Sequence, residues 1–218
     1  TSAALTINQK VLNSNSSRIY NATTTAAASD ITLTNQVSGE TLQLSNSAAT
    51  SSKNVGSYSI SNLSGVTISD QAGANASSGA LATNYTLTGG THSFAINPKA
   101  VNIARTRQYN GTTNIAASDI SGITGTVNTE ALTMSSGLGS TSSANVGTYN
   151  LTDTSAGTLA LGNGSNGGLA SNYTLTGGTQ DYTITQRVLN SSGSKIYDAN
   201  TNALAADITL SNLVSGET

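Results

Sequence analysis

The sequence contains no cysteine and no tryptophan, and it has one histidine, one proline and one phenylalanine among 218 residues. Without cysteine, a disulfide framework and a cysteine-based zinc site are both excluded. Charged residues make up only 8% and the net charge is −2, so the chain lacks the basic face that nucleic-acid binding needs. No apolar run approaches the roughly 18 residues of a membrane span, so we expect no membrane insertion by this segment.

The sequence does contain a long internal repeat. Tyr20, Tyr109 and Tyr197 each follow a basic residue by two positions, and they are 89 and 88 residues apart. A period of this length indicates tandem domains. The expected divisions are the last strand of a preceding repeat (1–7), repeat 1 (8–97), repeat 2 (98–185) and the first part of a truncated repeat 3 (186–218). We expect the natural protein to continue in both directions.

Short segments in which apolar and polar residues alternate predict half-buried strands. They are Ile31–Leu33, Leu42–Leu44, Tyr58–Ile60, Val66–Ile68, Tyr85–Leu87 and Phe94–Ile96. Helical periodicity is lacking, although Ala26–Asp30 and Ala203–Asp207 are each predicted to form one short helical turn. The fold class is therefore mainly β, with tandem small β-domains. An immunoglobulin-like sandwich is favoured, and a β-grasp-like domain with one short helix per repeat is the alternative.

The junction between repeats 1 and 2 is short, because about four residues separate Ile96 from the next apolar alternation at Val101. Pro98 fixes its own φ and restricts Asn97. A flexible tether would be longer and rich in glycine and serine. We therefore expect stiffly connected domains.

A residue with a repeated catalytic or binding role should recur at the same position in each copy. Tyr182 aligns with Phe94, so that position does not require a hydroxyl, and His92 aligns with Gln180, so no histidine base is repeated. Four charged positions recur, which suggests fixed ion pairs or solvated edge-strand charges: Lys10/Lys99/Arg187, Arg18/Arg107/Lys195, Asp30/Asp119/Asp207 and Glu40/Glu130/Glu217. We expect no enzyme, no catalytic residue, no cofactor and no metal site. Calcium at a repeat junction, held by Asp70, Asp153 or backbone carbonyls, stays an open alternative.

The remaining repeated residues are assigned structural roles in three motifs. Asp or Asn followed by Gly or Ala and then Thr is turn chemistry after a strand. The turn motif holds Tyr20, Asn21, Tyr109, Asn110, Gly111, Tyr197 and Asp198. The Asn-Val-Gly-x-Tyr motif holds Asn54, Gly56, Tyr58, Asn145, Gly147 and Tyr149. The Asn-Tyr-Thr-Leu motif holds Tyr85 and Tyr173.

These motifs together resemble the YDG/MBG-type tandem repeats of large filamentous-haemagglutinin-like adhesins of Gram-negative bacteria. The likeness is carried by the Tyr-Asp-Gly-like turn, Asn54–Gly56, Asn84–Leu87, Ile96–Pro98 and Asn212–Thr218. One departure concerns the second copy, in which Val127-Asn128-Thr129-Glu130 stands where the first has Val37-Ser38-Gly39-Glu40. The Ser-Gly turn is expected to be lost there.

The resemblance implies cargo of two-partner secretion, located outside the cell at the bacterial surface. We expect structural stalk or spacer repeats of a giant adhesin or biofilm-matrix protein, projecting a distal binding region. The partners would be neighbouring repeats of the same longer chain. The alternative function is a multivalent array that binds carbohydrate (exopolysaccharide) weakly in each repeat. That function would require an exposed tyrosine or an Asn/Asp cluster on one face of every repeat.

Overall fold

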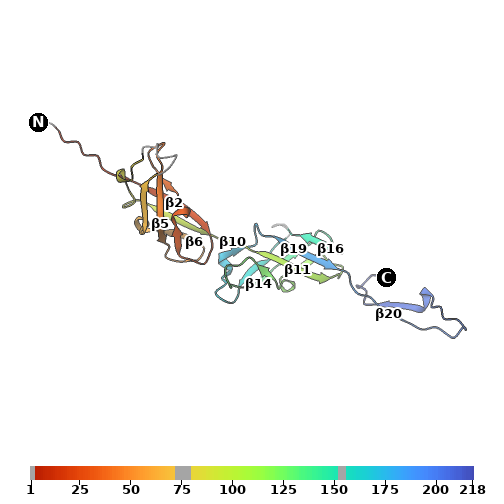
Figure 1. Ribbon diagram of the computed structural model, residues 1–218. Helices are drawn as coiled ribbons and strands as arrows, with labels where there is room; N and C mark the ends of the chain where they lie inside the picture. The colour runs from red at the N-terminus through yellow and green to blue at the C-terminus, as the bar shows by residue number, and fades with distance from the viewer. Residues whose placement is uncertain (1–2, 72–79, 152–155) are drawn as a thin grey trace. The chain divides into compact units, whose positions relative to one another are not determined.

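The computed structural model describes residues 3–71, 80–151 and 156–218, and it shows a mainly β protein (Figure 1). The chain forms two compact units. Unit 1 comprises Thr1–Lys99, Val127–Thr129 and Leu169–Thr174, and unit 2 comprises Ala100–Thr126, Glu130–Gly168 and Leu175–Thr218. The prediction of tandem small β-domains is confirmed. Within the described ranges, no helix is long and apolar enough to cross a membrane.

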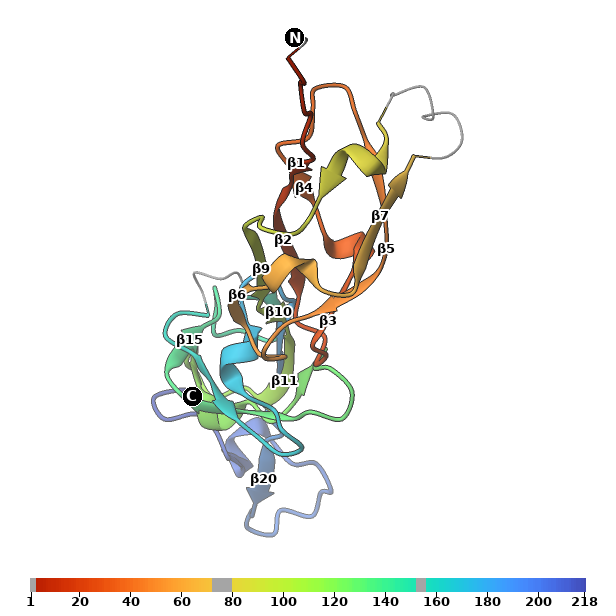
Figure 2. The ribbon, with the colours of Figure 1, turned by 90° about the vertical axis from the view of Figure 1, so that its left-hand side faces the viewer.

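The larger sheet of unit 1 has four strands in the order β4-β2-β9-β6. Their bounds are Leu33–Thr34 for β4, Asn13–Ile19 for β2, His92–Asn97 for β9 and Gly56–Ser59 for β6. The two central strands, β2 and β9, are parallel and lie side by side, as Figure 2 shows. The outer strands pair antiparallel with them. This sheet is therefore mixed, whereas both sheets of an immunoglobulin-like sandwich are antiparallel.

The second sheet of unit 1 is antiparallel, in the order β3-β5-β7. It contains β3 (Thr25–Ala27), β5 (Leu42–Ala49) and β7 (Val66–Asp70). A short parallel pair joins β1 (Lys10–Val11) to β8 (Tyr85–Thr86). Within residues 3–71 and 80–99, the unit also has three single 3-10 turns, η1 (Ala28–Asp30), η2 (Ser61–Leu63) and η4 (Ala82–Asn84).

The structure bears on two predictions about short segments. The predicted helical turns are confirmed, because η1 and the equivalent η7 (Ala205–Asp207) lie inside the two alanine-rich stretches. Residues 3–7, expected to form a strand, are exposed and lie outside any strand, since no other strand pairs with them.

Apolar side chains from both sheets fill the core of unit 1. Leu12, Tyr20, Leu63, Phe94 and Ile96 are each no more than 2% exposed. Four of these five lie on or beside β2 and β9, so the parallel pair is also the centre of the core. Burial of side chains of this size contributes roughly 1.5–3 kcal/mol each.

Unit 2 repeats this plan with a four-stranded sheet in the order β13-β11-β19-β16. These strands are β13 (Ile123–Thr124), β11 (Asn102–Gln108), β19 (Gln180–Thr185) and β16 (Gly147–Asn150), and β11 and β19 are again parallel. The place of β5 is taken by two strands, β14 (Leu132–Ser136) and β15 (Leu138–Ser140), which are separated by Gly137 with a φ of 102°. They pair with β17 (Ala160–Asn163) and β12 (Asn114–Ala116), respectively.

The remaining elements are short. They are β10 (Lys99–Ala100), η5 (Ala117–Asp119), η6 (Ala170–Asn172), β18 (Tyr173–Thr174), β20 (Asn190–Gly193) and β21 (Ile208–Ser211). The core of unit 2 is formed by Ile103, Ile115, Ile120, Leu151, Leu159, Tyr182 and Ile184.

Candidate functional site

The Tyr-Asp-Gly-like motif forms the same turn in all three copies. The side-chain oxygen of its Asn or Asp accepts a hydrogen bond from the backbone amide two residues later, which is an Asx turn. The three bonds are Thr23 N to Asn21 Oδ1 (3.2 Å), Thr112 N to Asn110 Oδ1 (3.1 Å) and Asn200 N to Asp198 Oδ1 (3.1 Å). The residue between them is left-handed, with φ of 63° at Ala22, 75° at Gly111 and 60° at Ala199. Glycine adopts this conformation without the steric cost that alanine has.

The basic residue before each turn tethers it. The Arg18 and Arg107 guanidinium groups donate hydrogen bonds to the carbonyl oxygens of Thr23 and Thr112, and Lys195 Nζ donates to Asn200 O at 3.0 Å. Arg18 also lies over the Phe94 ring, and Arg107 lies over the Tyr182 ring, at 5.5 and 5.7 Å from the ring centres. In the third copy, Lys195 also forms an ion pair with Asp198 (2.8 Å), which belongs to the turn motif and not to the recurring acidic positions. The two arginines act mainly as hydrogen-bond donors to the turn.

The Asn-Val-Gly-x-Tyr motif closes a small loop on itself. The Tyr58 hydroxyl donates to Asn54 O (2.6 Å), and the Tyr149 hydroxyl donates to Asn145 O (2.7 Å). Both rings are half-buried. These hydroxyls are therefore engaged in holding their own loops.

The tyrosine of the Asn-Tyr-Thr-Leu motif anchors a neighbouring turn. In the first copy, the Tyr85 hydroxyl donates to a Glu40 carboxylate oxygen and accepts from Val37 N (3.3 Å). The hydrogen bond to Glu40, together with burial, raises the pKa of Tyr85 above its ordinary value. In the second copy, the Tyr173 hydroxyl accepts from Val127 N (3.0 Å).

The turn after Val127 survives although its Ser-Gly pair is replaced. In the first copy the left-handed residue is Gly39, with a φ of 84°. In the second copy it is Asn128, with a φ of 50°, one position earlier in the turn. Asparagine tolerates the left-handed region better than other residues with a side chain. The expected loss of the turn is therefore corrected to a change of turn geometry.

One polar contact in unit 1 involves a residue that the sequence reasoning missed. Asn172 is fully buried; its Oδ1 accepts from Val55 N (2.9 Å) and its Nδ2 donates to Asn54 Oδ1 (3.1 Å). Next to it, the Tyr173 ring packs edge-on against Tyr20, with ring centres 5.4 Å apart. The available signal was that Asn84 and Asn172 occupy the same position in a verbatim repeat of seven residues.

Exposure of the tyrosines bears on carbohydrate binding. Tyr20, Tyr85, Tyr173 and Tyr182 are buried, and Tyr58, Tyr109 and Tyr149 are half-buried. Tyr197 is 89% exposed. The Tyr182 hydroxyl is buried and has no hydrogen-bond partner in the described part of the chain, and burial raises the pKa of Tyr182. No repeated position thus places an exposed ring in every described copy.

His92 is a buried structural residue. Its Nε2 lies 2.9 Å from Leu87 O, a carbonyl that can only accept, so Nε2 donates, and Nδ1 lies 3.2 Å from Ser14 Oγ. In the second copy, Gln180 Nε2 donates to Leu175 O at the same distance of 2.9 Å. The two side chains therefore hold equivalent carbonyl groups.

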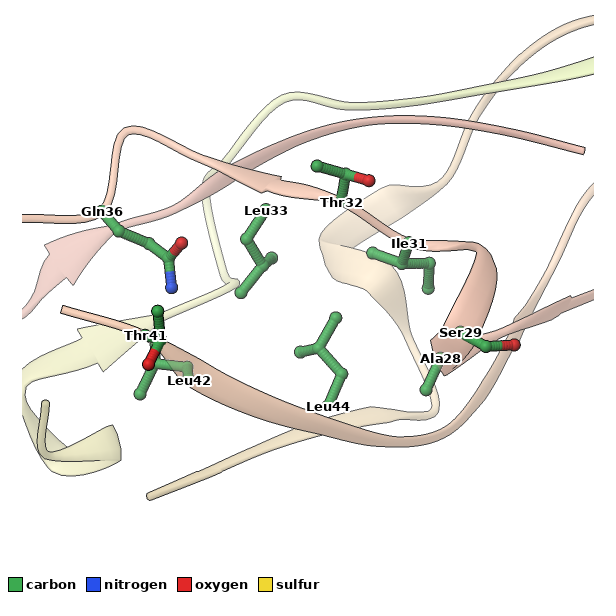
Figure 3. Close-up of a pocket in the computed structure, with 9 residues that line it drawn as sticks. All are labelled: Ala28, Ser29, Ile31, Thr32, Leu33, Gln36, Thr41, Leu42 and Leu44. Atoms are coloured by element: carbon green, nitrogen blue, oxygen red, sulfur yellow. The ribbon is translucent and has the colours of Figure 1, made fainter. Parts of the chain in front are cut away.

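A pocket of unit 1 lies beside β4 and β5 and has a volume of about 470 Å³ (Figure 3). It is lined by Ala28, Ser29, Ile31, Thr32, Leu33, Gln36, Thr41, Leu42 and Leu44. The lining holds neither a charged group nor an aromatic ring, so it offers no platform on which a sugar could stack.

Acidic residues do not gather in the described ranges, where no group of three or more His, Cys, Asp or Glu side chains could hold a metal ion. Asp70 Oδ1 accepts a hydrogen bond from Ala82 N (2.7 Å). Asp153, the other residue considered for calcium, lies outside the described residues.

The fold and these motifs define a tandem array of small β-domains whose repeated polar residues build turns and loop anchors. The model of the YDG domain matches residues 1–93 and 95–182, so the chain belongs to the YDG domain family. No curated protein and no solved structure matched the chain.

Proposed function

We propose that the chain is a structural stalk or spacer of a large extracellular bacterial adhesin or biofilm-matrix protein of the filamentous-haemagglutinin-like type, exported by two-partner secretion. Its partners would be neighbouring repeats of the same longer chain, and it would carry no enzyme activity. Membership of the YDG family supports the repeat assignment, and the resemblance described above supports the location at the cell surface.

The observation that carries this proposal is the parallel pairing of the first and last long strands in each unit. The chain enters β2 at Asn13 and leaves β9 at Asn97, and these two positions are at opposite ends of the pair. Tension on the chain therefore acts along the strands. Six residue pairs, from Ser14↔His92 to Ile19↔Asn97, are loaded together. The equivalent pair in unit 2 runs from Ile103↔Gln180 to Gln108↔Thr185.

The engagement of the repeated side chains supports a structural role as well. Several repeated polar groups bond backbone groups of their own turns and loops: the hydroxyls of Tyr58 and Tyr149, the Asx oxygens and the arginine guanidinium groups. A carbohydrate-binding array would instead need an exposed tyrosine or an Asn/Asp cluster directed at the ligand in every repeat. The repeated Asn or Asp of the turn is exposed in all three copies, but its side-chain oxygen accepts a hydrogen bond from its own turn. Screening the full chain on a glycan array tests that alternative, and specific binding that is lost on changing one repeated position would favour it.

A spacer must also hold its two ends at a distance that is set by the number of repeats. Small-angle scattering on proteins that carry two, four and six consecutive repeats should give a maximum dimension that grows linearly with repeat number. A matched series with a Gly/Ser linker in place of Asn97-Pro98-Lys99 should grow more slowly, because flexible chains extend only as the square root of their length. Equal, slow growth in both series would contradict the spacer role.

A further inference from the structure

Unit 2 carries an open counterpart of the site that holds Asn172 in unit 1. We propose that Tyr109, Asn145 and Val146 form a receptor for the Asn-Tyr-Thr segment of another YDG repeat. The contacts of Asn172 and Tyr173 in unit 1 support this receptor, which does not depend on the stalk role.

Unit 1 shows the occupied form of this receptor. Residues 169–174 belong to unit 1, and Asn172 binds both the amide of Val55 and the side chain of Asn54. Its own exposure is 0%. A buried amide side chain that satisfies a backbone N–H and a second side chain is costly to remove, so the contact selects for asparagine at this position.

Tyr173, the residue after Asn172, also contacts the receptor of unit 1. Tyr173 meets the Tyr20 ring at an interplanar angle of 78°, and its hydroxyl accepts from Val127 N. Edge-to-face aromatic pairs of this kind are favourable beyond the area that they bury. The receptor in unit 1 is thus defined by one tyrosine ring, the Asn-Val pair and one backbone amide.

Unit 2 presents the same residues at the aligned positions. Tyr109 corresponds to Tyr20, Asn145-Val146 to Asn54-Val55, and Val214 to Val127. Asn145 is exposed and Val146 is 52% exposed. Val146 lines a pocket of about 420 Å³ together with Tyr109, Gln186, Arg187, Leu189, Leu213, Val214 and Glu217.

The occupant follows from the sequence of the segment in unit 1. Asn-Tyr-Thr-Leu-Thr-Gly-Gly occurs identically at residues 84–90 and 172–178, so any repeat that keeps this motif carries the complementary side chains. Asn84, the residue aligned with Asn172, is exposed in unit 1. Its side chain is therefore accessible to a receptor of this kind in another repeat. The receptor therefore fits a second YDG repeat.

Fluorescence anisotropy tests the proposal in the full chain. The probe is a labelled synthetic peptide with the sequence of residues 169–178, and the control probe has alanine at the position of Asn172. The full chain should bind the first probe roughly tenfold more tightly than the control probe, because alanine cannot bond the Val146 amide or the Asn145 side chain. The Ser140→Ala chain, changed at an exposed residue of β15, should keep this preference, whereas the Asn145→Ala chain should bind the first probe more weakly. Equal binding of the two probes, or equal binding of a scrambled peptide, would overturn the proposal.

A double-mutant cycle checks the contact on which the comparison rests. The stability losses of Asn54→Ala and Asn172→Ala should be clearly non-additive, whereas those of Asn54→Ala and Asn84→Ala should add. Additive losses in the first pair would show that these two side chains do not interact, and this would remove the basis of the proposal.

Discussion

At the scale of single residues, the half-buried tyrosines and the buried Tyr182 differ in whether the hydroxyl is needed. The Tyr58 and Tyr149 hydroxyls each bond a carbonyl of their own loop, so these positions require tyrosine. The Tyr182 hydroxyl is buried without a hydrogen-bond partner among the described residues, and the aligned residue is Phe94. The alignment of the copies predicted that this position does not need a hydroxyl, and the missing hydrogen bond gives the physical reason.

Tyr182→Phe should leave the free energy of unfolding unchanged or raise it by up to about 1 kcal/mol, because an unsatisfied buried hydroxyl is removed. Tyr58→Phe is the matched control and should lower it by about 1 kcal/mol through loss of the bond to Asn54 O. Chemical denaturation measures both. A clear loss of stability in Tyr182→Phe would mean that its hydroxyl is bonded.

His92→Gln should change the free energy of unfolding by less than about 1 kcal/mol, because glutamine already bonds the equivalent carbonyl in the second copy. His92→Leu should cost about 1–3 kcal/mol, since the Leu87 carbonyl and the Ser14 hydroxyl would lose their buried partner. Thermal unfolding of the two variants distinguishes them. Equal costs would indicate that the packing of the ring matters more than its hydrogen bonds.

Ala22→Gly should stabilise the chain by about 0.5–1 kcal/mol, because Ala22 is left-handed and the strain of alanine there exceeds the entropy cost of glycine. Gly111→Ala, the reverse change at the aligned position, should destabilise by about 1–2 kcal/mol. Differential scanning calorimetry on the pair measures opposite shifts. Shifts of the same sign would contradict the Asx-turn explanation of the motif.

The elements differ in how well the sequence predicts them. Strands with apolar alternation, such as Leu42–Leu44 and Val66–Ile68, lie within β5 and β7. The central strand β2 was not predicted, because its sequence Asn-Ser-Asn-Ser-Ser-Arg-Ile has almost no apolar residue. Its inward-facing serines are buried through hydrogen bonds, Ser14 to His92 and Ser16 to the Thr32 amide. Periodicity of hydrophobic residues cannot detect a strand whose core face is polar and satisfied.

The η6–β18 segment depends on Asn172. Asn172→Ala should lower the free energy of unfolding of unit 1 by about 1–3 kcal/mol, because the Val55 amide and the Asn54 side chain lose a buried partner. Asn84→Ala removes the same side chain from an exposed position and should change stability by less than about 0.5 kcal/mol. Native-state hydrogen exchange at Val55 measures the difference directly. Unchanged protection in Asn172→Ala would contradict the assignment.

At the scale of the whole molecule, the recurring feature is the parallel pair that closes each domain. The sequence predicted the tandem arrangement from its period, and it predicted a mainly β fold from its alternation. It did not predict the parallel pairing, because residues nearly 80 positions apart form it, such as Ser14 and His92. Local patterns carry no information on the direction in which such distant strands pair.

Single-molecule pulling tests the role as a stalk under tension most directly. When the full chain is stretched from its two ends, unit 1 should unfold at a high force, since all six residue pairs between β2 and β9 must break together. When handles are placed on Asn15→Cys and Ser93→Cys, which are paired near one end of the same two strands, the pairs break one after another. The account predicts a clearly lower force in this second geometry. Equal unfolding forces in the two geometries would contradict it.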